Sequence, residues 1–308
     1  MNSTPVPWKV LGTPIHRARS AEEAITLVGY DYKVTKRPLK ANIRGRKQVE
    51  VPGFFSTVRT DTGKILGVVK SRYEIVDNIS ALSFMDPAIR NGDAVFENCG
   101  CLNGGSKVWI LLRLKKDMFI GPSRDIVQRY LLLVNSFDGS TPVVAKITPI
   151  RLLCSNTLSA ALSGMGPEFR VRHTQQVHAQ IDEVKRILSN VDSQYSQLEY
   201  VFNRLALKRL TDKDLLTYVK TLIPDNEEAE SHTRTENIRS QILDLQARGI
   251  GAEQNRGSLF GIYNAVTELV DHHLSNKNPE KHLKSIWFGA GERMKQRAFS
   301  LAESMLSN

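Results

Sequence analysis

The 308-residue sequence contains only three cysteines, Cys99, Cys101 and Cys154. So few thiols, in an odd number, argue against the disulfide framework of a small secreted domain and favour a reducing compartment. Residues 1–12 lack the apolar run of a signal peptide, and no stretch approaches the roughly 18 uninterrupted apolar residues of a membrane span. The sequence therefore predicts a soluble, cytoplasmic protein that has no membrane partner.

The sequence also lacks the motifs of several enzyme classes. It has no G-x-x-x-x-G-K-[ST] phosphate-binding loop and no G-x-G-x-x-G that opens a Rossmann helix. Cys99 and Cys101 form a C-x-C pair, but no further pair of cysteines or histidines completes the roughly four ligands that zinc needs. We therefore expect no metal, no cofactor and no catalytic activity.

Cys154 keeps one enzymatic alternative open. The segment around it, "PIRLLCSNTLSAAL", could turn sharply from a strand into a helix and expose the thiol as a nucleophile. A nucleophile elbow has glycine two residues to either side, where this chain has Leu152 and Asn156. A thiol nucleophile also needs a histidine base, which only a distant part of the chain could supply. We expect a buried structural cysteine between a strand and a helix capped by Ser155 or Asn156, with a hydrolase as the alternative.

Glycine-containing turns between apolar, β-branched segments predict three antiparallel hairpins between residues 54 and 150. The turns are "DTG", "NGG" and "FDGS", and a helical stretch at residues 78–92 separates the first two hairpins. An earlier short helix at residues 20–29 is indicated by Ser20 as N-cap and Glu23 as its capping-box partner.

From residue 174 the hydrophobic pattern takes the period of a helix. Residues 174–210 contain no proline or glycine, and apolar residues recur at threes and fours from Val177 to Leu205. This pattern predicts one helix about 55 Å long, either an interdomain rod or a surface for self-association. The predicted fold is α+β: an antiparallel β-hairpin sheet with an inserted helix, followed by a long helix and a helical C-terminal region. The predicted domains are a basic, β-rich one over residues 1–173 and a helical, oligomerising one over residues 174–308.

The net charge of +10 is unevenly distributed along the chain. Residues 1–173 hold 25 Lys and Arg against 14 Asp and Glu, whereas residues 174–308 hold 17 against 18. A local positive field attracts polyanions, most often nucleic acid. The segment 33–47 either follows phosphates or is a solvated loop, and Tyr73 either stacks on bases or packs half-buried. The candidate nucleic-acid-binding residues are Lys33, Lys36, Arg37, Lys40, Arg44, Arg46, Lys47, Tyr73, Lys146, Arg151, Arg170 and Arg172.

Several longer blocks resemble a phage/plasmid-like family of unknown function. They are "SAEEAI", "VPGFFSTVRTDTGKILGVVKSRYEIVDN", "RYLLLVNSFDGSTPVVAKITPIRLLCSNTLSAAL", "GIYNAVTELVDHH" and "WFGAGERMKQRAFSLA". The family occurs in phages, prophages and plasmids, so the resemblance implies a mobile-element protein in bacterial cytoplasm. It supplies no chemistry for particular residues.

The predicted architecture is similar to that of phage single-strand annealing proteins and their eukaryotic recombination-mediator relatives, which anneal complementary DNA without ATP. We therefore expect a homo-oligomeric nucleic-acid-binding protein that anneals single-stranded DNA in recombination. The alternatives are a non-catalytic interaction protein that acts on a host factor and the hydrolase that uses Cys154.

Overall fold

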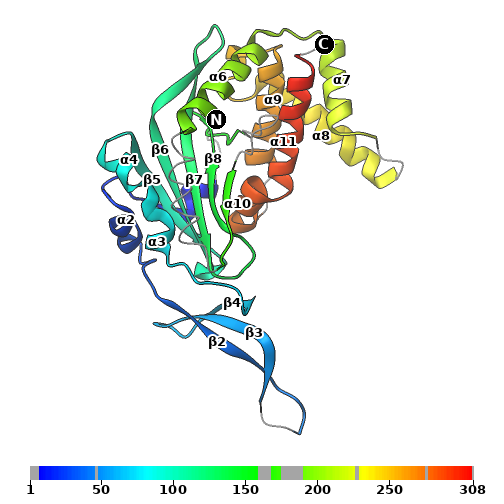
Figure 1. Cartoon of the computed structure of the whole chain (residues 1–308). Coiled ribbons are helices and arrows are strands. Elements are labelled where there is room, and N and C mark those ends of the chain that lie inside the picture. The colour runs from blue at the N-terminus through cyan, green and yellow to red at the C-terminus, as the bar shows by residue number, and fades with distance from the viewer. Residues whose placement is uncertain are drawn as a thin grey trace.

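The computed structural model describes residues 7–45, 48–158, 168–174, 190–225, 229–274 and 277–306. Its body contains a seven-stranded antiparallel sheet with the strand order β1-β5-β6-β7-β8-β10, in which β9 also pairs with β7 (Figure 1). The strands are β1 Gly12–Pro14, β5 Ala94–Leu102, β6 Lys107–Ile120, β7 Asp125–Ser136, β8 Val143–Ile147, β9 Ile150–Arg151 and β10 Glu168–Val171. The three predicted turns join β3 to β4, β5 to β6 and β7 to β8, so the hairpin prediction is confirmed.

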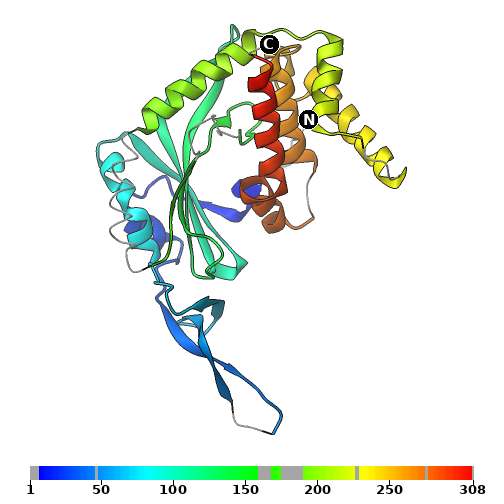
Figure 2. The same cartoon turned by 45° about the vertical axis from the view of Figure 1, so that its right-hand side comes forward.

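A second sheet projects from the body, as Figures 1 and 2 show. It consists of β2 Val34–Ala41, β3 Val49–Arg59 and β4 Ile65–Lys70, with β3 in the centre. We call these three strands the hairpin sheet. The segment 33–47 is therefore not a plain solvated loop, because most of it is an edge strand that pairs with β3. Pro38 is tolerated there because an edge strand needs hydrogen bonds on one side only.

Both faces of the main sheet are covered. Val108, Ile110 and Leu112 of β6 point into one buried cluster, whereas Trp109 and Leu111 point into another on the opposite face. Successive side chains of a strand point to opposite faces, so a strand buried on both faces reads as a continuous apolar run. This explains the run "VWILLRL", which lacks the polar alternation of a half-exposed strand.

Helices lie on both sides of this sheet. The short ones are α1 Pro7–Leu11, α2 Ala21–Leu27, α3 Asn78–Leu82 and α4 Asp86–Arg90. The C-terminal helices are α6 Val191–Leu207, α7 Asp212–Leu222, α8 Ala229–Arg248, α9 Leu259–Glu268, α10 Pro279–Phe288 and α11 Ala290–Ser304. The Ser20 cap is confirmed, since its side chain accepts the Glu23 N–H at 3.1 Å. The α+β class with an antiparallel hairpin sheet and C-terminal helices is also confirmed. Within the described ranges, no helix is long and apolar enough to cross a membrane.

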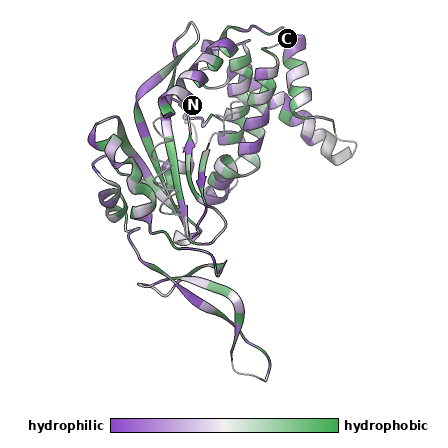
Figure 3. Ribbon diagram, in the orientation of Figure 1, coloured by the Kyte–Doolittle hydropathy of each residue, from purple (hydrophilic) through white to green (hydrophobic). Residues whose placement is uncertain are grey.

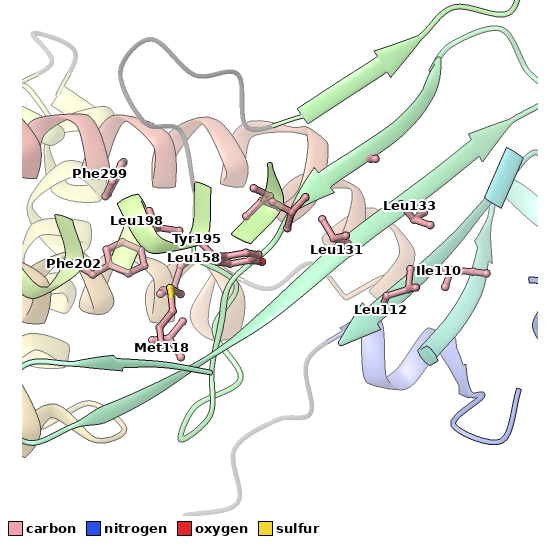
Figure 4. Close-up of a cluster of buried hydrophobic side chains, with 14 of the residues drawn as sticks. Ile110, Leu112, Met118, Leu131, Leu133, Leu158, Tyr195, Leu198, Phe202 and Phe299 are labelled. Atoms are coloured by element: carbon pink, nitrogen blue, oxygen red, sulfur yellow. The ribbon is translucent and has the colours of Figure 1, made fainter. Parts of the chain in front are cut away.

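The core joins the sheet to the C-terminal helices. Figure 4 shows Leu131 and Leu133 of β7 in one buried cluster with Leu198 of α6 and Phe299 of α11. The ring of Phe202 lies 5.7 Å from that of Phe299, edge to face. Residues from both sides of position 173 therefore share one core, and the predicted domain boundary stays a prediction.

The predicted long helix is described only in its second half, because residues 175–189 lie outside the described residues. The described half, α6, ends at Leu207, after which Lys208 takes an extended backbone conformation. Within it, Val191, Tyr195, Leu198 and Leu205 are buried in the protein's own core. This half of the apolar stripe therefore forms an internal contact, and self-association stays a prediction without its support.

The segment after Cys154 differs from the prediction. Residues 155–158 are not helical, since Ser155 has a φ of +57° and Thr157 forms a β-bridge with Ile150. Thr157 leaves the helical path because its N–H and Oγ1 both donate to Asp271, at 2.6 and 2.7 Å. Neither Ser155 nor Asn156 is therefore a helix cap, and residues 159–167 lie outside the described part of the chain.

Candidate nucleic-acid interface

The hairpin sheet concentrates the positive charge of the chain. Residues 33–72 hold 11 Lys and Arg but only two acidic residues, Glu50 and Asp61, which makes a net +9 out of the chain's +10. Figure 3 shows hydrophilic and hydrophobic residues interleaved along these strands. The charge asymmetry between the two parts of the sequence thus becomes a local feature of one projecting sheet.

One face of the hairpin sheet rests on the β7–β8 turn of the body. Thr57 Oγ1 donates to the Phe137 carbonyl at 2.7 Å. Gly67 stands so close to the turn that a Cβ on it would lie 2.4 Å from Asp138 Cα, so only glycine fits. Val69 is buried beside them. We call this the inner face.

A tyrosine before β2 and another after β4 fix the hairpin sheet to the body near the end of β7. Tyr32, just before β2, packs its ring 5.8 Å from that of Phe137 and donates its hydroxyl to the Gly105 carbonyl. Tyr73, just after β4, donates its hydroxyl to the Ser136 carbonyl at 2.7 Å. Burial raises the pKa of Tyr32 to about 12 and also raises the pKa of Tyr73, so both stay hydrogen-bond donors.

Arg59 of this sheet already has partners within the protein. Its guanidinium lies 3.8 Å from the centre of the Tyr32 ring and 2.6 Å from an oxygen of Asp61. The hydrogen bond from Arg59 lowers the pKa of Asp61 to about 2. One of the two acidic residues of this segment is thereby partly neutralised.

The predicted cations of the segment 33–47 divide into three groups. Lys33, Arg37, Lys40 and Arg44 are exposed, as a binding role requires. Lys36 instead donates to the carbonyls of Tyr73 and Ser71, at 2.7 and 3.1 Å. It thereby fixes the segment that follows β4 to β2. The predictions for Arg46 and Lys47 lie outside the described residues.

Tyr73 contacts the residue that follows the predicted cation Arg172 at the end of β10. Its ring stacks on that of His173, with the centroids 4.8 Å apart and the planes at 18°. One ring face is therefore occupied, although base stacking by Tyr73 stays a prediction. Arg172 is exposed next to His173, and Arg170 is exposed on β10. Burial lowers the pKa of His173 to about 4, so this ring adds no charge at neutral pH.

Arg151 contradicts its prediction as a phosphate contact. It is fully buried between the sheet and the helical layer. Its Nε lies 2.6 Å from Asp125, and its two terminal nitrogens donate to the carbonyls of Ile250 and Gly251 at 2.9 and 2.8 Å. Its charge and its donors are satisfied inside the fold, so the prediction is wrong.

Lys146 is excluded for the same reason. Its Nζ lies 2.6 Å from Glu292 of α11 and donates to the Trp287 carbonyl at 3.2 Å, all in buried surroundings. A parallel pair nearby joins Lys295 to Asp271 at 3.0 Å. Buried charges are normally paired in this way, because an unpaired one costs several kcal/mol. The Lys146–Glu292 pair connects the sheet to α11, whereas the Lys295–Asp271 pair joins two parts of the C-terminal helical region.

The surroundings of Cys154 support the structural interpretation. The thiol is buried, and burial raises its pKa to about 11, which leaves almost no thiolate near neutral pH. A histidine does approach from the helical half, as the alternative required. However, His272 Nε2 donates to the Cys154 carbonyl at 2.9 Å and to Asn156 Oδ1 at 2.8 Å, not to the sulfur. Among the described residues, no group of three or more His, Cys, Asp or Glu side chains could hold a metal ion.

Sequence reasoning missed several residues of the hairpin sheet. Phe54 and Lys70 are exposed and oppose each other across β3 and β4. Val68 and Ile65 are exposed on the same strand β4. The signal was present in the alternation of "GFFSTVRT", since neighbouring phenylalanines of a strand must point to opposite faces.

Fold and site together define a class: an α+β protein whose main sheet is covered on both faces and carries a projecting, strongly cationic hairpin sheet. The chain matches the family model described as a domain of unknown function (DUF932) over residues 65–287, and it belongs to that family. The matched range begins at the first residue of β4, so β2 and β3 precede it. No curated protein and no solved structure matches the chain.

Proposed function

We propose that the protein binds nucleic acid through the hairpin sheet. The observation that carries this proposal is the net charge of +9 on residues 33–72, in a sheet that projects from the body (Figure 1). Arg37, Lys40 and Arg44 are exposed there, and none of the three forms an ion pair with another residue that the structure describes. Lysine and arginine in such a position neutralise phosphates and release counterions.

The outer part of the sheet supports a binding role as well. Beyond the Phe54–Lys70 pair, β3 pairs with β2 alone, at Lys40–Glu50 and Ala41–Val49. We call the described residues of this part, 40–45 and 48–50, the free arm. A two-stranded ribbon is only marginally stable in water, so its order benefits from a partner that lies along it. Its cations favour a polyanion as that partner.

We further propose that the ligand is single-stranded DNA, which the protein anneals as a homo-oligomer during phage or plasmid recombination in bacterial cytoplasm. What supports this proposal is the resemblance of the sequence blocks to phage/plasmid-like proteins, together with a sheet that offers both cations and aromatic rings. A hydrolase that uses Cys154 is disfavoured by the burial of the thiol.

The test is fluorescence anisotropy with a labelled 30-nucleotide single strand and the matching duplex, over a salt series. The triple variant Arg37→Gln/Lys40→Gln/Arg44→Gln should bind more weakly. Its log–log salt slope should fall by about 2, since each contact with a single strand contributes about 0.7. The matched control is Lys208→Gln/Lys213→Gln/Lys220→Gln, which removes the same charge from exposed positions at and near α7.

Two outcomes would contradict the proposal. Wild-type protein that binds neither the single strand nor the duplex at low salt would exclude DNA binding. Equal losses in the two triple variants would show a general effect of net charge rather than a site on the hairpin sheet.

A further inference from the structure

The register of the hairpin sheet sorts its residues into two faces. Residues directly opposite each other in an antiparallel pair lie on the same side. Ser56 of β3 is flanked by Arg37 of β2 and Val68 of β4, and Phe54 is paired with Lys70. These residues therefore share one side, with Ile65 at its end opposite Val58. Thr57 and Gly67, which contact the body, are paired on the other side.

Apart from the small, buried Ser56, the outer face is exposed and partly apolar. Phe54 is 39% exposed, Val68 49% and Ile65 63%. By contrast, Thr57 and Val69 of the inner face are buried against the body. Three neighbouring apolar side chains on an open sheet face indicate a surface that a partner covers.

Charge complementarity indicates the chemistry of that partner. Arg37 and Lys70 stand on the two outer strands, and Phe54 stands on the strand between them. Strands lie about 4.8 Å apart and Arg37 is two residues out of line with Lys70, so the two positions are separated by roughly 12 Å on this face. No acidic residue belongs to the pairs that define this face in the described strands. The face therefore combines an aromatic ring with flanking cations and suits a polyanion that also has aromatic groups.

We propose that the outer face is a platform for single-stranded nucleic acid, on which a base stacks on Phe54 while Arg37 and Lys70 contact the phosphates on either side. This inference rests on the proposed function and adds to it a strand preference and a stacking residue. A single strand has unpaired bases whose faces are free to stack on aromatic side chains. In a duplex those faces are covered by neighbouring base pairs, so a duplex would contact only the cations.

A tryptophan at position 54 reports base stacking directly. The three tryptophans of the chain, Trp8, Trp109 and Trp287, are all buried and should respond little to a ligand on the hairpin sheet. The Phe54→Trp variant should lose fluorescence when titrated with a dT 20-mer, and not with a 20-base-pair duplex. An oligouridine 20-mer in the same titration separates RNA from DNA. The matched control is Phe119→Trp, because Phe119 is 40% exposed on β6 of the body.

Affinity gives an independent readout. Phe54→Ala should weaken binding of the dT 20-mer about 5- to 10-fold, the lower part of the range known for one stacked base, and leave duplex binding unchanged. Phe119→Ala should change neither. Arg37→Gln and Lys70→Gln should weaken both ligands. Thermal melting of each variant shows whether the fold is retained.

The failures of the two proposals are distinguishable. If wild-type protein binds no nucleic acid, the proposed function is wrong. If it binds DNA but Phe54→Trp is not quenched and Phe54→Ala binds as wild type, the platform is wrong and the proposed function stands. If Phe54→Ala instead disrupts an oligomer seen by sedimentation, with DNA binding retained, the face is a contact between copies and the platform is again overturned.

Discussion

Replacing Arg151 by alanine tests whether the motif "PIRLLCSNTL" serves the fold or a ligand. The substitution removes the partner of Asp125, whose carboxylate is completely buried and accepts a further hydrogen bond from Asn255 at 2.8 Å. It also leaves the carbonyls of Ile250 and Gly251 without their donors. Burial already raises the pKa of Asp125, so an uncompensated charge at this position is strongly disfavoured.

The expected loss of stability follows from the geometry. Removing one partner of a buried ion pair typically costs about 3–5 kcal/mol, because the other charge stays buried. The unfolding entropy of a chain of this length converts that loss to a fall in melting temperature of about 5–8 °C. The double variant Asp125→Ala/Arg151→Ala should recover part of the loss, since it leaves no unpaired charge.

The assay is thermal unfolding followed by circular dichroism, together with DNA binding at a permissive temperature. The control is Arg248→Ala, which breaks the ion pair between Arg248 and Asp244. The Arg248 side chain is 77% exposed. Exposed pairs contribute about 0–1 kcal/mol, so the melting temperature of this control should fall by less than about 2 °C. An Arg151→Ala variant that melts like wild type but no longer binds DNA would refute the structural role and restore the phosphate contact.

Three further predictions concern titration, reactivity and capping. The pKa of His173 is lowered to about 4 from an unfolded value near 6.5, so the unfolded chain takes up a proton that the folded protein does not. Stability should therefore fall, by up to about 3 kcal/mol, as the pH drops from about 6.5 to about 4, and urea titrations of His173→Phe should show a smaller fall; an unchanged pH dependence would contradict this. In native protein at pH 8, iodoacetamide should modify the half-buried Cys101 before the buried Cys99 and Cys154, as mass spectrometry would show, and early labelling of Cys154 would revive it as a nucleophile. Thr211→Ala should cost about 1 kcal/mol in urea unfolding by removing the capping box with Asp214, and a neutral result would show that α7 does not depend on its cap.

Local signals in the sequence were sufficient for much of the fold. Glycine turns marked the hairpins, and the cap at Ser20 marked the start of α2. The strand β2 was harder, because "VTKRPLKA" lacks a clear alternation and becomes a strand through its pairing with β3. The apolar stripe of α6 looks the same in sequence whether it packs inside the protein or against a second copy.

The candidate site was predicted less well, because a charge in the sequence says nothing of its exposure. Lys146 and Glu292 are 146 positions apart, and Arg151 and Asp125 are 26 apart, so no local pattern shows that they pair. The exposed cations of the segment 33–47 could be predicted from the sequence. The segment contains no acidic residue, so its charges are not neutralised by residues next to them in the sequence. Phe54 needed the strand register, which tells it apart from the adjacent Phe55.

The two tyrosines that fix the hairpin sheet have a consequence for how this protein could vary. Tyr32 packs against Phe137, and Tyr73 donates to the neighbouring Ser136 at the end of β7, so the whole insertion starts and finishes close to one place on the body. Its outer portion can then be lengthened, shortened or exchanged without displacing the strands of the body. Relatives that keep these two tyrosines can therefore have inserts of a different length or charge. A foreign hairpin could also be grafted at this position by design.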